Sequence, residues 1–176
     1  MTVLSLHDLL HEYDLARAWT DQLTADLDDD TLYWRPSPAS SAIAWHLGHQ
    51  AAVNHFLIRN LLSAEPSPDP GLDAVFDSAT PEADRGDLPG RARLSAYRAA
   101  VAERTRAMAG RIDRGAVGAP SQMPMIAAGV LVAAINHEYQ HDAWVDEMRQ
   151  LQGLGPGPVP GSGRVTMIDG YWVVQP

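Results

Sequence analysis

Apolar residues recur at three- and four-residue steps in four long segments of this chain, and this spacing limits the possible fold more than any other feature. It places the apolar side chains on one face of an α-helix. The pattern predicts helices over residues 5–27, 41–63, 91–112 and 121–151, and Ser41 is expected to cap the second of them. The last helix is apolar nearly all round as far as Ile135, so we expect its first half to be buried.

Proline and glycine mark the segments between these helices. Residues 28–40 contain Pro36 and Pro38 and are expected to form a loop. Residues 65–90 are rich in proline and acidic residues, which predicts a long surface connection with one short helical turn around residues 73–76. Such a connection favours an all-α four-helix bundle with a crossover after the second helix, in which helices two and three need not be antiparallel neighbours.

The end of the chain differs in composition from the rest. Residues 153–163 are rich in glycine and proline and are expected to form an irregular arm. In residues 164–174, Asp169 and Gly170 lie between two β-prone runs, a pattern typical of a small hairpin. The length of 176 residues suits about one domain. We therefore expect one domain over residues 1–152, with residues 153–176 as an extension of it.

The composition argues against several classes of function. Because the chain has no cysteine, it cannot form disulfides, thiolate metal sites or a cysteine nucleophile. All 13 basic residues are arginine, which excludes a Schiff-base lysine and the lysine of a phosphate-binding loop. The formal charge of −9 disfavours nucleic acid and anionic membranes as partners, so a small-molecule substrate is expected.

The distribution of apolar residues also bears on location. The longest apolar stretch, residues 126–135, is about half the roughly 20 residues needed to span a bilayer. The first residues lack the cationic region of a signal peptide. We therefore expect a cytoplasmic protein.

Six of the seven histidines form three pairs with helical spacing, and one of these pairs, His7 and His11 near the start of the chain, lies among acidic residues and is expected to be solvated. His137 and His141 lie four residues apart in the last predicted helix, so their side chains can share one metal ion. His46 and His49 lie three apart in the second helix and also share a face, and either could supply a third ligand. Because facing helices of a bundle commonly assemble metal sites in its core, the pattern favours a divalent metal held by imidazoles.

Residues 137–141 also match the metallopeptidase motif H-E-x-x-H, in which Glu138 would be the general base. The subtype with a third histidine requires Gly at position 144 and His at position 147, where this chain has Trp144 and Glu147. A carboxylate ligand would have to come from near Asp169, where no helix is expected to hold it. The peptidase interpretation is therefore not favoured.

Three stretches together resemble the DinB/YfiT-like family. They are Leu-Tyr-Trp-Arg-Pro at residues 32–36, Ser-Ala-Ile-Ala-Trp-His-Leu-Gly-His at residues 41–49, and His-Glu-Tyr-Gln-His at residues 137–141. The resemblance implies a four-helix bundle with crossover topology, a divalent metal on three histidines, and often a homodimer. The chain departs from the family pattern after the second histidine of the last helix, where Asp142-Ala143-Trp144 stands in place of Arg-Gly-Gln.

The resemblance also implies a ligand set. His49, His137 and His141 fall on the metal-binding positions of the family, whereas His46 stands where the family usually has an apolar residue. Imidazole suits several metals, and we expect zinc first, with nickel or iron as alternatives. Other candidates for a part in the reaction or in a substrate pocket are Glu138, Trp45, His46 and His55, and Arg35 and Arg59 could bind a carboxylate of a substrate.

Three histidines leave a coordination position of the metal open, and this allows two classes of reaction. A bound thiol would ionise, which gives a thiol-dependent S-transferase or isomerase acting on a small electrophilic molecule. The resemblance favours this class, because it implies a low-molecular-weight thiol of the mycothiol or bacillithiol type as cosubstrate. A bound water would attack an ester or amide, which gives a hydrolase. A third possibility is a non-catalytic metal-binding protein whose long loop and tail bind a partner.

Overall fold

The structure, a computed structural model, describes residues 4–62, 64–115 and 120–175. Its elements are α1 (Leu6–Thr24), α2 (Asp29–Tyr33), α3 (Ile43–Ile58), α4 (Pro70–Val75), the 3-10 helix η1 (Glu82–Asp84), α5 (Arg91–Asp113), α6 (Met123–Leu151), β1 (Val165–Ile168) and β2 (Tyr171–Val174). The fold is therefore helical apart from a hairpin near the C-terminus, as the sequence predicts. None of the helices in the described residues has the length and apolar character that a membrane span requires.

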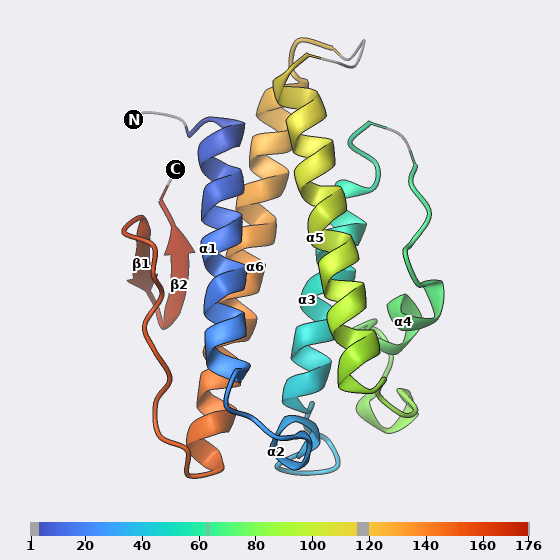
Figure 1. Cartoon of the computed structure of the whole chain (residues 1–176), viewed down its shortest axis with the longest axis vertical. Helices are drawn as coiled ribbons and strands as arrows, with labels where there is room; N and C mark the ends of the chain where they lie inside the picture. The colour runs from blue at the N-terminus through green and yellow to red at the C-terminus, as the bar shows by residue number, and fades with distance from the viewer. Residues whose placement is uncertain (1–3, 63, 116–119, 176) are drawn as a thin grey trace.

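The four long helices α1, α3, α5 and α6 pack side by side as a bundle (Figure 1). Helix α1 packs mainly against α6, and α3 packs against both α5 and α6. Figure 1 shows that α3 and α5 run in the same direction, opposite to α1 and α6. The chain between α3 and α5 has to return along the outside of the bundle before α5 begins, which is the predicted crossover.

The helix limits differ from the predicted ones in the second helix. Helix α3 begins at Ile43 with Ala42 at its N-cap, and no side chain caps it. The Ser41 hydroxyl, expected to be the cap, instead donates to the carboxylate of Glu82. Helix α3 ends at Ile58 and does not extend to residue 63, which lies outside the described residues.

Short helices form in two segments where the sequence predicts loop or a single turn. Asp28 caps α2, because its carboxylate accepts a hydrogen bond of 2.8 Å from the Thr31 backbone N–H. Asp69 caps α4 in the same way, so the turn expected at residues 73–76 begins at Pro70. Both helices lie in stretches too short to show a hydrophobic period.

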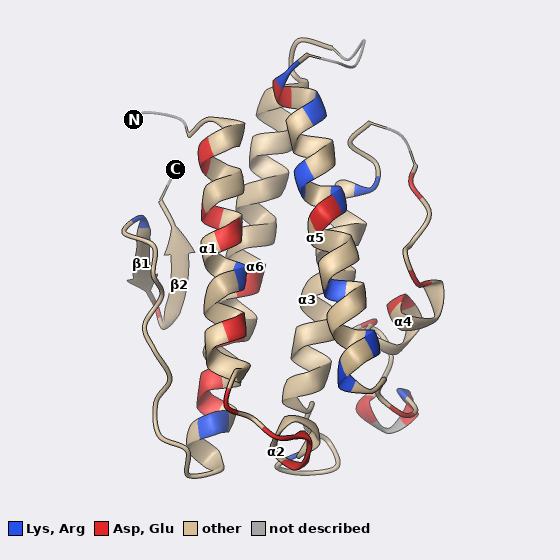
Figure 2. Cartoon of the chain, viewed as in Figure 1, with Lys and Arg blue, Asp and Glu red and all other residues tan. Residues whose placement is uncertain are grey.

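The first half of α6 is less buried than its composition predicts. Ala127 and Leu131 are buried against the bundle, but the side chains of Met125 and Ile126 are 70% and 48% exposed. The rest of the bundle covers only one face of α6 here, so the apolar residues on its other face remain in contact with solvent. Helix α3, by contrast, carries no Asp, Glu, Lys or Arg (Figure 2). Most of its residues are buried.

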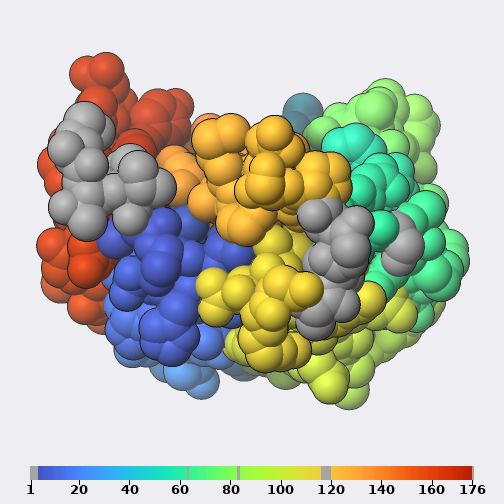
Figure 3. Space-filling view, turned by 90° about the horizontal axis from the view of Figure 1, so that it is seen from above, coloured from blue at the N-terminus to red at the C-terminus, as the bar shows by residue number. Residues whose placement is uncertain are grey.

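The chain after α6 packs back onto the bundle. The Trp19 indole N–H donates to the Pro158 carbonyl at 2.6 Å, and the Val174 backbone N–H donates to the Asn136 side chain at 2.9 Å. Strands β1 and β2 pair antiparallel around a turn at Asp169 and Gly170, whose φ angles of 50° and 88° suit a tight hairpin turn. Seen from the end where α6 begins, the C-terminal arm flanks one side of the bundle and the crossover flanks the other (Figure 3).

Candidate metal centre

Packing of α3 against α6 brings His49, His137 and His141 together. Each offers a ring nitrogen, and these nitrogens lie within 4.8 Å of one another. The distances between ring centroids range from 4.4 Å for His137 and His141 to 5.2 Å for His49 and His137. Two nitrogens bound to one zinc ion at about 2.1 Å lie at most about 4.2 Å apart, so small ring rotations would close the set around an ion.

The orientation of His49 is set by the crossover. Its Nδ1 lies 2.7 Å from the backbone carbonyl oxygen of Phe76, which follows α4. A carbonyl oxygen only accepts, so Nδ1 carries the proton and Nε2 keeps its lone pair. Metal-binding histidines commonly use one nitrogen for the metal and donate the other N–H to a carbonyl or carboxylate. His49 therefore has the tautomer that a metal ligand requires.

Gly48 makes the contact between His49 and the Phe76 carbonyl possible. The ring of Phe76 packs against α3 so closely that a Cβ added at Gly48 would lie 2.1 Å from the ring atom Cζ. Only glycine leaves room for the aromatic ring at this position. The close approach holds the Phe76 backbone beside His49.

His46 lies beside the three-histidine group without belonging to it. Its Nδ1 is 2.9 Å from the Nδ1 of His141, so one of these nitrogens donates and the other accepts. If His141 binds a metal through Nε2, His46 is the acceptor that fixes its ring. The spacing in the sequence left His46 and His49 open as the third candidate ligand, and in the structure the ring nitrogens of His49 group with those of His137 and His141.

The four histidines are held in the neutral form. Burial lowers the pKa of His46 and of His137 to about 4, and it also lowers the pKa of His49 and of His141. Neutral imidazole is the form that binds a divalent cation. The residues present, the tautomer of His49 and the neutral charge state thus fit a divalent metal.

Glu138, a candidate for a catalytic role, is turned away from the histidines. Its carboxylate is buried and lies 3.5 Å from the Arg98 guanidinium, 4.0 Å from that of Arg17 and 3.3 Å from the Thr20 hydroxyl. These partners come from α1 and α5, whereas the third histidine of the group, His49, comes from α3. The H-E-x-x-H match therefore does not place a general base beside the histidines.

Asp142 joins Glu138 in this buried polar cluster. Its carboxylate accepts hydrogen bonds of 2.8 Å from the Thr20 hydroxyl and 2.7 Å from the Gln50 side-chain amide. Burial and the neighbouring charge of Glu138 raise the pKa of the Asp142 carboxyl. The cluster lies behind the histidines, in the centre of the bundle.

The histidines open on a surface pocket of about 560 Å³, which we call the mouth. Trp45 is a wall of the mouth and stacks on the ring of His49, with centroids 4.5 Å apart and planes inclined by 12°. Trp144 lies against His141, with centroids 4.8 Å apart. Glu82 and Arg85 of the crossover complete the rim. Glu82 and Arg85 were not among the predicted site residues, because the segment that carries them has no periodic pattern.

His55 lies outside the mouth. Its side chain is buried, and its two ring nitrogens have no hydrogen-bond partner among the described residues. It lines a separate pocket of about 360 Å³ that also borders His49 and Arg59. The guanidinium of Arg59 lies 4.8 Å from the centre of the Phe56 ring.

Comparison with known protein families gives a match. The model of a protein family described as the DinB superfamily matches residues 12–145, a range that includes all three histidines of the group. A comparison with curated proteins gives no match.

Proposed function

Since the chain belongs to the DinB superfamily, we propose that His49, His137 and His141 hold a divalent metal and that the protein is a thiol-dependent transferase or isomerase. Its substrates would be a low-molecular-weight thiol of the mycothiol type and a small electrophilic molecule. A divalent metal bound there would lower the pKa of a thiol ligand and keep it ionised at neutral pH. Zinc is the first expectation for an all-imidazole site.

The observation that carries this proposal is the combination of three neutral imidazoles with a mouth that has no free carboxylate. Among the described residues that line the mouth, Glu82 is the only acid. Its carboxylate is occupied by Arg35, Arg85 and the Ser41 hydroxyl. Water attack on an ester or amide gains from a general base, whereas a thiol ionised by a metal needs none. This arrangement favours the thiol reaction over the hydrolase.

The residues around the three histidines would each have a defined part in this reaction. His46 and the Phe76 carbonyl orient two ligands, while Trp45 and Trp144 shield the histidines from solvent. In a transfer, the sulfur forms a bond to the electrophilic carbon, the thiol proton passes to solvent, and the leaving group departs with its bonding electrons. In an isomerisation, the sulfur adds to the carbon and later leaves it again.

The test begins with metal content. The protein is purified without a histidine tag, and bound metal per chain is measured by elemental analysis for the wild type and for His49→Ala, His137→Ala and His46→Ala. We expect about one metal per chain in the wild type and in His46→Ala, and none in the other two, with the helical circular dichroism signal retained. Metal retained in His137→Ala would contradict the ligand set.

The reaction is then tested on the loaded protein. Conjugation of mycothiol to monobromobimane is followed by fluorescence, and hydrolysis of 4-nitrophenyl acetate by absorbance. We expect conjugation that depends on metal and on His49. Metal-dependent ester hydrolysis without conjugation would replace the transferase by the hydrolase, and a wild type without metal would favour the non-catalytic protein.

A further inference from the structure

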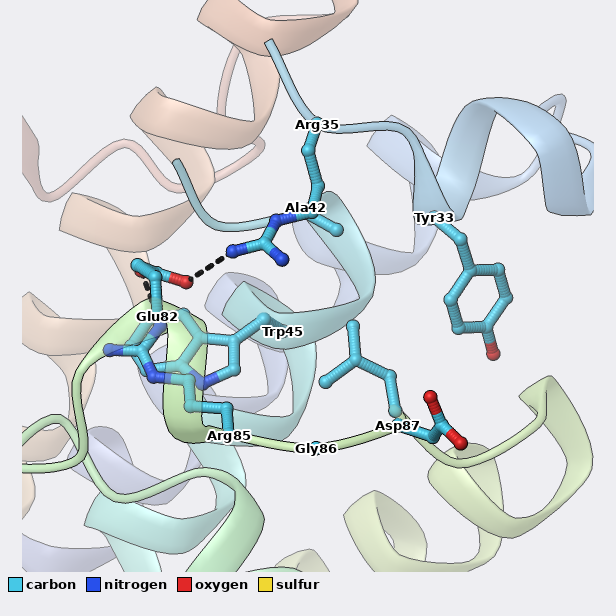
Figure 4. Close-up of a pocket in the computed structure, with 9 residues that line it drawn as sticks. Tyr33, Arg35, Ala42, Trp45, Glu82, Arg85, Gly86 and Asp87 are labelled. Carbon is cyan, nitrogen blue, oxygen red and sulfur yellow. Dashed lines mark hydrogen bonds and ion pairs between the residues drawn. The ribbon is translucent and has the colours of Figure 1, made fainter. Parts of the chain in front are cut away.

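A second pocket, of about 420 Å³, adjoins the mouth. It lies between the chain that follows α2, the first turn of α3 and the crossover (Figure 4). The mouth and this pocket share Trp45, Glu82 and Arg85. Figure 4 shows Arg35, Glu82, Arg85 and Trp45 gathered at one end, whereas Tyr33 and Asp87 lie at the other.

Arg85 is fixed in place at the shared wall. Its Nε donates to the Thr80 carbonyl at 2.9 Å, and its Nη1 donates to the Ser41 hydroxyl at 3.0 Å and pairs with Glu82. Its guanidinium lies 3.9 Å from the centre of the Trp45 ring, and its side chain is only 9% exposed. The N–H groups of Nη2 make no hydrogen bond within the described part of the chain, so they are available to a ligand.

Arg35, in the chain that follows α2, pairs with the same carboxylate, that of Glu82. Its Nε donates to the Ser40 carbonyl at 2.6 Å, and its Nη2 donates to the Pro38 carbonyl at 3.1 Å and to Glu82 at 3.0 Å. As with Arg85, one guanidinium nitrogen, here Nη1, has no partner among the residues described. One carboxylate thus serves two guanidiniums, which leaves an excess of one positive charge at this end of the pocket.

The excess charge lies close to the histidine group. The Trp45 indole packs against both groups: the Arg85 guanidinium lies 3.9 Å from its centre, and the His49 imidazole stacks on it with centroids 4.5 Å apart. In a protein with a formal charge of −9, this is a local positive region beside a site for a cation.

We propose that Arg35 and Arg85 form a subsite for the carboxylate of a substrate whose reacting group lies at the three histidines. Planar guanidinium groups with fixed N–H donors suit a carboxylate, and partial burial strengthens the pairing. The proposal rests on the proposed function, because it assumes that substrate binds at the metal. It gives that function a substrate class, a small organic acid.

The test uses the protein with Co²⁺ in the histidine site and two thiols of equal size, 3-mercaptopropionate and its neutral amide 3-mercaptopropionamide. Binding of either sulfur is followed by the near-ultraviolet absorption of a cobalt–thiolate bond. We expect the wild type to bind the acid at least tenfold more tightly than the amide. In Arg35→Gln and Arg85→Gln, most of this preference should be lost while affinity for the amide stays the same.

Two controls separate the subsite from other effects. Direct contact of the carboxylate with Co²⁺ would favour the acid over the amide equally in every variant. The subsite is therefore judged by how far the acid-over-amide preference of each variant falls below that of the wild type. Arg93→Gln removes a guanidinium that pairs with Asp69 outside both pockets and should leave the preference unchanged. Arg85 is nearly buried, so Arg85→Gln could disturb the crossover. The Arg35 side chain is 38% exposed, and Arg35→Gln is therefore the decisive variant.

The outcomes distinguish the two proposals. If both thiols give the cobalt–thiolate absorption and the preference for the acid survives in Arg35→Gln and Arg85→Gln, the subsite is wrong and the proposed function stands. Equal binding of acid and amide by the wild type leads to the same conclusion. If neither thiol gives the absorption, the proposed function and the subsite both fail.

Discussion

Replacing Gly48 by alanine should weaken metal binding although residue 48 is not a ligand. A Cβ at this position would lie 2.1–2.3 Å from three carbons of the Phe76 ring, whereas ordinary contacts begin at about 3.4 Å. The ring would have to move by more than about 1 Å. The Phe76 carbonyl would move with it, and its 2.7 Å contact with His49 Nδ1 would exceed the range of a hydrogen bond.

The expected magnitudes follow from these contacts. Loss of the partner that orients a metal-binding histidine typically costs 10- to 100-fold in metal affinity. For stability, alanine gains about 1 kcal/mol over glycine within a helix, but overpacking a core costs about 1–3 kcal/mol. We therefore expect a free energy of unfolding for metal-free Gly48→Ala that is unchanged or lower by up to about 2 kcal/mol.

Gly129→Ala is the matched control. Gly129 also lies within a helix, α6, but a Cβ there meets nothing within 4 Å. This variant should be more stable by about 1 kcal/mol and keep its metal affinity. Affinity is measured by competition with a chromophoric chelator, and stability by urea unfolding of the metal-free protein. If Gly48→Ala behaved like Gly129→Ala in both measurements, the role given to Phe76 would be refuted.

Two further predictions concern buried and exposed ion pairs. Arg98→Met should lower the free energy of unfolding by about 3 kcal/mol, because it leaves the buried Glu138 carboxylate with Arg17, at 4.0 Å, as its remaining cationic partner. Arg93→Met removes an exposed ion pair and should lower it by less than about 1 kcal/mol. Equal losses of stability in urea unfolding of the two variants would contradict this difference. Hydrogen bonds from Arg149 lower the pKa of Asp26 below its usual 3.8, so this pair stabilises the fold above about pH 4 and the contribution is lost as the pH falls. Asp26→Asn should therefore be less stable than the wild type at pH 7, and the difference should shrink towards pH 3; a difference independent of pH would exclude this coupling.

The long helices and the two histidine pairs were predictable because they depend on local spacing. Residues 137 and 141 share a face of any helix that contains them, and so do residues 46 and 49. The choice between His46 and His49 was not local. In the structure the ring nitrogens of His49 group with those of His137 and His141. The carbonyl that orients His49 belongs to Phe76, which lies 27 residues further along the chain and reaches His49 because the crossover folds against α3.

The rim of the mouth was not predictable for the same reason. Glu82 and Arg85 lie in a stretch whose only regular element is a three-residue 3-10 helix, so no period in the sequence points to them. The surroundings of Glu138 could not be read from its motif either. Its neighbours Arg17 and Arg98 come from other helices, and their approach turns it into a structural residue of the interior.

The buried polar cluster behind the histidines has a consequence for the alignment of the helices along their axes. Thr20, Gln50, Arg98 and Asp142 come from α1, α3, α5 and α6, and each bonds to another member of the cluster or to Glu138. Apolar contacts are non-directional and allow one helix to slide along another, whereas the hydrogen bonds of this cluster require a fixed distance and angle.

A shift of α6 by one turn, about 5.4 Å, would break the cluster and carry His137 and His141 away from His49. The buried polar residues therefore fix the positions of all four helices along the bundle axis relative to one another. A version of this bundle with an entirely apolar interior could be equally helical, yet its histidines would no longer meet at a single point.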